Sequence, residues 1–204
     1  MQPKKREARS AEPVAAEDEA ALLQRVACKD RHAFEVLYRN YYRRLTRFLE
    51  RVTRKPQLTD EILDDTMLVV WRKADTFHGG SQVSTWIFAI AYNKAMKALK
   101  RERPRAEARP DVDGLAAGTD PETQLLQSES RLMLMRLLAE ISPDQRAVIE
   151  LTYYHGYAYK DIATILGCPV DTVKTRMFHA RRKLRAILVA REEESGSHAL
   201  VPIR

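Results

Sequence analysis

The sequence is poor in the residues that mark disulfide-rich, zinc-binding or all-β proteins. Its two cysteines, Cys28 and Cys168, lie far apart and outside any Cys-x-x-Cys pattern. This argues against a disulfide framework or a zinc cluster and favours a reducing compartment, so we expect a cytoplasmic protein. Seven glycines and nine prolines in 204 residues are too few for a sandwich of strands with many tight turns. Leu, Ala, Arg and Glu are frequent instead, and they predict an all-α fold.

The sequence also has no long apolar run and no familiar catalytic motif. No window approaches 18 apolar residues, so we expect no membrane insertion. No apolar run follows the cationic start of the chain, as a signal peptide would require. The chain lacks a P-loop, a dinucleotide-binding glycine motif and a Ser-His-Asp order, which predicts a protein that is not an enzyme and uses no cofactor. What it does have is a net charge of +7, which fits a nucleic-acid partner where the cations cluster.

Two helical stretches flank a segment that is rich in helix breakers. Residues 104–122 hold three prolines and two glycines without an apolar period, which is typical of a flexible linker. On either side, apolar residues recur at steps of three and four, the period of an amphipathic helix. We therefore predict two small helical domains, 21–103 and 123–190, with tails at 1–20 and 191–204.

The stretch 160–184, "KDIATILGCPVDTVKTRMFHARRKL", predicts a helix, a turn and a second helix. Gly167 permits a left-handed turn, and Pro169 presets the entry to the second helix. From residue 170 to residue 191 there are seven Lys or Arg and one acid, Asp171. A helix of about 20 residues spans roughly 30 Å, enough to enter a major groove and continue along the backbone. We interpret it as a reader of duplex DNA; the alternative is an ordinary amphipathic helix with a solvated charged face.

A second candidate surface lies between residues 71 and 103, where aromatic residues precede a basic run. Single-stranded DNA binds to surfaces of this kind, because bases stack on aromatic rings while cations hold the backbone. Trp86 has two possible roles: it packs in the core at the start of its helix, or its ring stacks on a base. Four polar residues are candidates for base contact, with a solvated loop and helix face as the alternative: His78, Ser81, Ser84 and Asn93.

Four acids lie just before this surface, in a helix that the sequence predicts over residues 58–75. No histidine accompanies them and the helix dipole explains carboxylates in a first turn, so we do not expect a metal site. We interpret them as a docking face for a basic protein, with apolar anchors nearby. The predicted docking residues are Asp60, Glu61, Asp64, Asp65, Met67, Leu68 and Trp71.

Taken together, these stretches resemble the bacterial RNA polymerase sigma factors of the extracytoplasmic-function (ECF) type, in the sigma-70 family. The resemblance runs from about residue 22 to residue 188. It is carried, in the order of the family, by "AFEVLYRNYYRRLTRFL", "DEILDDTMLVVWRKADTF", "STWIFAIAYNKAMKALKR" and "SPDQRAVIELTYYHGYAYKDIATILGCPVDTVKTRMFHARRKLR". Asp171 departs from the pattern, since the family often has glycine there.

The resemblance implies a promoter-specificity subunit. The first domain would resemble region 2, which docks on the β′ clamp helices of core RNA polymerase and melts the −10 element. The second would resemble region 4, which binds the β flap and reads the −35 element, and an anti-sigma factor would hold the protein inactive. The residues expected at −10 DNA are His78, Ser81, Ser84, Thr85, Trp86, Asn93, Lys97, Lys100 and Arg101. Those expected at −35 DNA are Lys174, Thr175, Arg176, Phe178, His179, Arg181 and Arg182.

Two other classes of function compete with this interpretation. A stand-alone helix-turn-helix regulator would bind duplex operators without polymerase, usually as a dimer. An all-α enzyme would use His155 or His179, but no partner residues for catalysis accompany either in the sequence.

Overall fold

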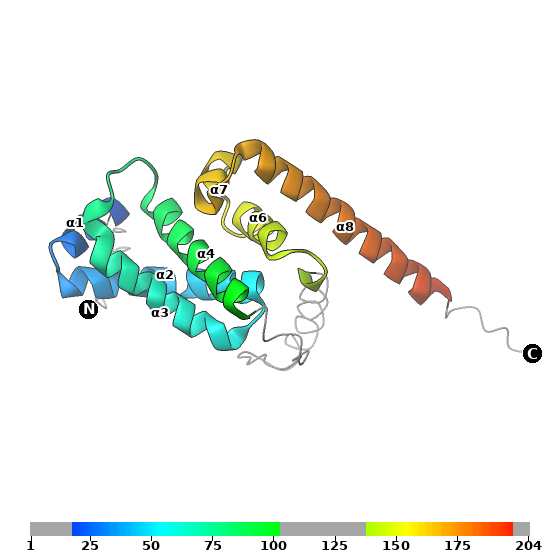
Figure 1. Ribbon diagram of the computed structural model, residues 1–204, viewed down its shortest axis with the longest axis horizontal. Helices are drawn as coiled ribbons and strands as arrows, with labels where there is room; N and C mark the ends of the chain where they lie inside the picture. Colours follow the sequence, from blue (N-terminus) through cyan, green and yellow to red (C-terminus); the bar gives the residue numbers. More distant parts are fainter. Residues whose placement is uncertain (1–17, 103–137, 198–204) are drawn as a thin grey trace, which may run out of the picture.

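The computed structural model describes residues 18–102 and 138–197, with side chains placed as far as residue 190. Within these ranges every regular element is helical, which confirms the all-α prediction (Figure 1). The expected linker, 104–122, and most of the expected N-terminal tail lie outside the described residues. The elements are α1 (Glu19–Ala27), α2 (Arg31–Thr53), α3 (Pro56–Lys73), the 3₁₀ turn η1 (Ala74–Thr76), α4 (Val83–Glu102), α6 (Pro143–Tyr153), α7 (Tyr159–Leu166) and α8 (Val170–Ser197).

Local sequence signals explain where the helices begin and end. Asp30 caps α2 by accepting a hydrogen bond from the Ala33 N–H, and α2 ends before Pro56, with Arg54 in the left-handed conformation. Ser142 opens α6 with a capping box that Gln145 completes. Gly167, at φ 61°, ends α7 in the left-handed conformation that the turn requires.

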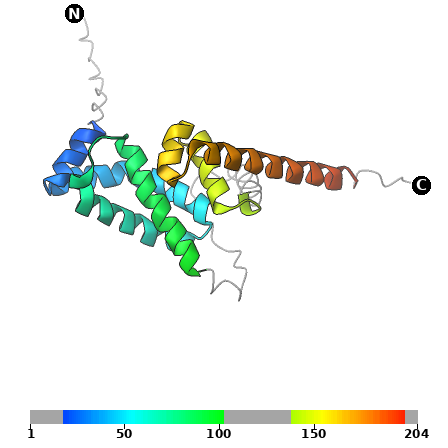
Figure 2. The same cartoon turned by 45° about the horizontal axis from the view of Figure 1, so that its top comes forward.

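The last helix is longer than the sequence pattern predicts. α8 continues to Ser197, past residue 191, where we expected a tail. Arg and Glu at positions 191–194 are good helix formers and nothing there breaks the backbone, so the helix runs on beyond the packed core. In both views it projects away from the other helices (Figures 1 and 2). None of the described helices is long and apolar enough to cross a membrane.

The two halves of the chain pack on each other. α6 lies along α2 and α7 lies along α4, so a single cluster of buried side chains runs through both halves (Figures 1 and 2). Phe48 of α2 and Phe88 of α4 are fully buried at this junction. The His155 ring lies against both, with centroids 6.0 and 4.7 Å away. The sequence pattern, which divides the chain at the predicted linker, gave no indication of this packing.

Two buried charges hold α6 against α2. Arg146 is only 6% exposed, and its guanidinium donates to the backbone carbonyls of Val52, Leu138 and Ile141 at 3.0 to 3.1 Å. Val52 belongs to the last turn of α2, where carbonyls have no partner within the helix. Glu150, fully buried, accepts from Arg51 at 2.9 Å; its burial raises the pKa of this carboxyl, and Arg51 opposes the rise.

Replacing Arg146 by Met is expected to destabilise the packed state by about 3 kcal/mol, because three buried carbonyls lose their donor. Urea unfolding followed by circular dichroism measures the change. Arg39→Met, at an exposed position of α2, is the matched control and should change stability by less than about 0.5 kcal/mol. Equal effects of the two substitutions would contradict the anchoring role of Arg146.

Candidate functional site

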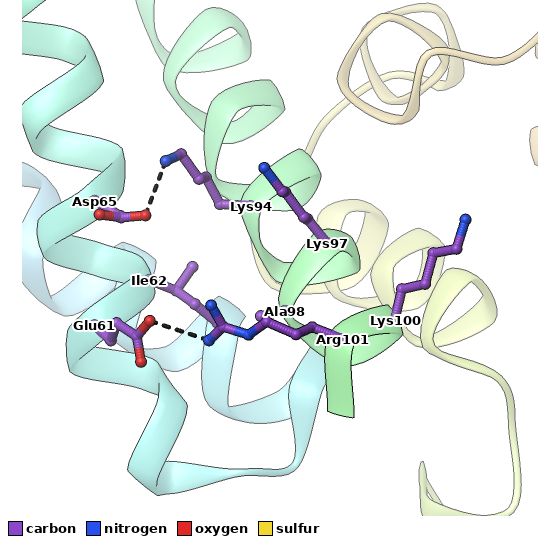
Figure 3. Close-up of a pocket in the computed structure, with 8 residues that line it drawn as sticks. All are labelled: Glu61, Ile62, Asp65, Lys94, Lys97, Ala98, Lys100 and Arg101. Carbon is purple, nitrogen blue, oxygen red and sulfur yellow. Dashed lines mark hydrogen bonds and ion pairs between the residues drawn. The ribbon is translucent and has the colours of Figure 1, made fainter. Parts of the chain in front are cut away.

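A groove between α3 and α4 brings six charged side chains of both signs together. It has a volume of about 370 Å³, and Ile62 and Ala98 are its apolar lining. Four cations surround it, all from α4: Lys94, Lys97, Lys100 and Arg101. Two carboxylates face them from α3, Glu61 and Asp65 (Figure 3).

Both carboxylates of this groove form ion pairs across it. Lys94 Nζ lies 2.8 Å from Asp65 Oδ2, and Arg101 Nη2 lies 3.2 Å from Glu61 Oε1. Lys100 points away from the two carboxylates, and neither carboxylate is joined to Lys97 or Lys100 (Figure 3). Sequence reasoning placed Glu61 and Asp65 with the docking acids, but the structure places them among the cations of the predicted −10 surface.

One of the other two acids of α3, Asp64, lines a second groove, between α2 and α3. Asp64 accepts a hydrogen bond from the Tyr38 hydroxyl at 3.0 Å. Partial burial, with the hydrogen bond to Asp64, raises the pKa of Tyr38 to about 12, and the charge of Asp60 adds to the effect. The groove has a volume of about 670 Å³, and its lining is Arg31, Phe34, Glu35, Tyr38, Asp64, Met67, Leu68 and Trp71.

The predicted docking anchors are therefore brought together only in part. Leu68 is 42% exposed and Trp71 is half-buried, with Phe34 packed edge-on against it at 5.1 Å. Met67 is 2% exposed, so it forms part of the floor of this groove and not of its exposed rim. Phe34 and Tyr38 also line this groove, although they were not among the predicted docking residues. Their spacing of four residues on α2 was the signal that they share one face.

The expected −10 residues divide between surface and core. His78 is exposed and Ser81 half-buried in the loop before α4, and Trp86 is half-buried with its ring 5.6 Å from Phe77. Ser84 and Thr85 are buried, at 7% and 0%, so the prediction that they contact bases is contradicted. The reason is helical phase: α4 begins at Val83, and its first turn already faces the core. The remaining expected residues are exposed along α4: Asn93, Lys97, Lys100 and Arg101.

α8 presents most of the expected −35 residues to solvent. Phe178 is 60% exposed and the His179 ring lies edge-on to it, while Arg182 lies over the Phe178 ring at 5.7 Å. Arg181 donates to the Tyr153 hydroxyl. The exposed members of the predicted set are Lys174, Thr175, Phe178, His179, Arg181 and Arg182.

Arg176 is the exception on α8. It follows Val173 by three residues and so lies beside the buried face, where its guanidinium pairs with Asp144 at 2.7 Å. Asp144 also accepts from the Tyr92 hydroxyl of α4 at 2.7 Å. In this packing Arg176 belongs to the junction between the halves, which contradicts its prediction as an exposed DNA contact.

Asp171, the one anion at the start of α8, has a local partner. Its carboxylate lies 3.0 Å from Lys174 Nζ, one turn further along the helix. A carboxylate in the first turn also suits the helix dipole. The acid therefore holds a neighbouring cation and leaves the rest of the basic surface of α8 unchanged.

His155 packs as a neutral side chain in the junction between the halves. Burial, with the positive charges of Arg44, Arg51 and Arg47, lowers its pKa to about 4. Protonation at pH 5 is therefore favoured in the unfolded chain and opposed in the folded one. The contribution of His155 to stability is complete above about pH 6.5 and is lost as the pH falls towards 4.

This sign predicts that wild type loses about 2 kcal/mol more stability than His155→Phe between pH 7 and pH 5. Glu150 has a raised pKa, so its effect on the pH dependence of stability is opposite to that of His155. Comparing the two proteins cancels this effect, because both contain Glu150. Urea midpoints at the two pH values measure it, with His32→Gln, at an exposed position, as the control. If the stability of His155→Phe fell between pH 7 and pH 5 by as much as that of wild type, the burial of a neutral imidazole would be refuted.

Comparisons with known proteins point to one family. Two family models match: sigma-70 region 2 over residues 37–105 and sigma-70 region 4 over residues 131–184. The chain is 30% identical to the ECF RNA polymerase sigma-E factor of Haemophilus influenzae over 174 residues, covering 80% of this chain and 92% of that protein. It is 27% identical to the RNA polymerase sigma-H factor of Pseudomonas aeruginosa over 181 residues, covering 82% and 92%.

Solved structures show the same fold. The structure of CnrH in complex with the cytosolic domain of CnrY matches with a TM-score of 0.65 at 22% identity, over 85% of this chain and 99% of that one. The sigma factor RpoE in complex with the anti-sigma factor NepR, from Bartonella quintana, matches with a TM-score of 0.59 at 25% identity, over 76% and 96%.

The chain belongs to the sigma-70 family of RNA polymerase sigma factors, in its ECF group. Its function is therefore that of a promoter-recognising sigma subunit, and a stand-alone helix-turn-helix regulator is not favoured.

Proposed function

We propose that this sigma subunit binds core RNA polymerase and divides promoter recognition between α8 and the α4 surface. The observation that carries the proposal is the presence, on one chain, of an exposed basic helix after a helix-turn-helix and a separate aromatic and basic surface along α4. The protein acts by binding rather than by catalysis, and its place is beside the polymerase in the cytoplasm.

The −35 element is read by the exposed side of α8. Lys174, Thr175 and His179 lie in the first turns, from which side chains reach base edges in a major groove. Arg181 and Arg182, further along, suit backbone phosphates, which position the helix without specifying sequence.

The −10 strand is captured at the start of α4 and along its exposed side. The exposed loop around His78, beside the half-buried Trp86, offers polar groups and a ring edge to an extruded base. The backbone of the strand would follow α4 towards Lys97 and Lys100, about 20 to 25 Å away at 1.5 Å per residue.

The groove between α2 and α3 is the docking surface for the β′ clamp helices. It combines the carboxylate of Asp64 with the exposed side chain of Leu68 and the ring of Trp71, a polar rim around apolar anchors. The second half of the chain binds the β flap.

Promoter binding requires the two halves to separate. The −35 and −10 elements are separate stretches of the promoter, and each base pair between them adds about 3.4 Å of duplex. In the packed form α7 contacts both α4 and α8, which keeps the two proposed DNA-reading helices close together. The contacts of Glu150 with Arg51 and of Tyr92 with Asp144 would therefore break on the polymerase. An anti-sigma factor that binds the packed form would hold the protein inactive; the sigma factor RpoE of Bartonella quintana, which resembles this chain, was solved in complex with the anti-sigma factor NepR.

Run-off transcription tests the proposal as a whole. Purified protein is mixed with core polymerase and a library of promoter fragments, and transcripts that depend on the protein are sequenced. We expect dependent transcripts that share two elements upstream of the start. Tight binding to duplex operators without polymerase, together with no transcription, would contradict the proposal.

Lys174→Ala and His179→Ala test the role of α8. Each is expected to reduce transcription from promoters with a −35 element by about tenfold, because a base-edge contact is worth about 1–3 kcal/mol. Lys183→Ala is the matched control for Lys174→Ala: it removes the same charge nine residues further along, on the side of α8 opposite to Lys174, and should have a much smaller effect. Binding to core polymerase should stay at the wild-type level in all three, and loss of that binding in the first two would refute the role assigned.

A further inference from the structure

The four acids of α3 form two pairs on adjacent faces of one helix. Asp60 and Asp64, four residues apart, lie on the side of Tyr38 and the groove between α2 and α3. Glu61 and Asp65, also four residues apart, lie on the side of α4 and its cations. A single helix therefore carries one acid pair towards the proposed docking surface and a second towards the proposed −10 surface.

Folding alone does not explain the second pair. Arg101 and Glu61 are 67% and 58% exposed, and Asp65 is half-exposed opposite Lys94. Ion pairs as exposed as these contribute little to stability. Their effect on the groove is larger, because they neutralise two of its four cations, Lys94 and Arg101, while neither carboxylate pairs with Lys97 or Lys100 (Figure 3).

We infer that Glu61 and Asp65 are built-in counter-ions that weaken the hold of the α4 groove on nucleic-acid phosphates. A phosphate that approaches Lys94 or Arg101 has to displace a carboxylate that already lies within 3.2 Å. These two cations therefore contribute less to phosphate binding than their charge would otherwise allow. The inference rests on the proposed −10 role of α4 and adds two residues that set its strength.

This arrangement favours sequence selectivity. Phosphate contacts are the same for every sequence, so a groove with four unpaired cations would hold any single strand. With two of them paired, capture of a strand depends more on base contacts near the start of α4. The protein would then release strands that lack the preferred −10 bases.

The test compares two double variants that make the same change of net charge on the same helix. Glu61→Gln/Asp65→Asn frees the α4 cations, and Asp60→Asn/Asp64→Asn is the matched control on the other face. The full chain, without polymerase, is titrated into a fluorescently labelled 20-nucleotide strand of dT at salt concentrations from 50 to 200 mM. Both variants contain the same α8, so its contribution cancels in the comparison.

The Glu61→Gln/Asp65→Asn variant is expected to bind dT more tightly than the control at 50 mM salt, with a steeper salt dependence. Two additional phosphate contacts steepen the slope of log affinity against log salt by about 1.4 for a single strand. The advantage over the control should therefore shrink about sevenfold between 50 and 200 mM salt. Equal slopes for the two variants would overturn the inference.

A second experiment tests whether the tighter binding of dT comes from Lys94 and Arg101. Adding Lys94→Ala and Arg101→Ala to Glu61→Gln/Asp65→Asn should abolish its advantage, and the same two substitutions in wild type should cost much less. An advantage that survives their removal would also overturn the inference. Run-off transcription with wild-type protein reports on the proposed function separately. Absence of transcripts there, with the dT result as expected, would reject the function and keep the counter-ion role. Thermal melts confirm that each variant is folded.

Discussion

The arrangement of the whole molecule depends on the buried guanidinium of Arg146. It joins the open carboxyl end of α2 to the start of the second half, through three carbonyls and without an acidic partner among its described contacts. Burial lowers its pKa to about 10, so it still carries its charge at neutral pH. A buried cation is tolerated only while all its acceptors are in place, which makes the packing of α6 on α2 all-or-none. The positions of α7 and α8 follow from that of α6.

The same junction decides which functional side chains are available. Arg176 of α8 is tied through Asp144 to Tyr92 of α4, so a change in the junction changes both proposed DNA-reading helices at once. Buried polar contacts of this kind are satisfied in the packed state and accessible to water when the halves part. They suit an interface that opens in use better than a purely apolar core would.

Much of the fold could be predicted from the sequence, because short-range rules determine it. Three features depend on neighbours within a few residues: the Asp30 cap, the left-handed turn at Gly167, and the buried side of α8 that contains Val173. The basic exposed face of α8 followed from the same periodicity. These are the features that carry the resemblance to sigma factors and lead to the function.

The remaining features depend on the exact phase of each helix and on contacts distant in sequence. Ser84 and Thr85 are polar, but α4 begins at Val83, and its first turn directs both side chains into the core. The four acids of α3 look like one cluster in the sequence. A helix turns 100° per residue, however, so the acids are divided between two adjacent faces of α3. Other groups look like surface residues in the sequence because partners that hold them are distant along the chain; they are Arg146, Glu150 and Arg176.

The central claim is that the two promoter-reading halves pack together in the free protein and separate on the polymerase. The most direct measurement is the distance between spin labels at positions 39 and 183, exposed sites on α2 and α8, in a chain whose two cysteines are replaced by Ser. We expect one narrow distance in the free protein, replaced by a longer distance in the complex with core polymerase and promoter. The same distance in both states would contradict the account.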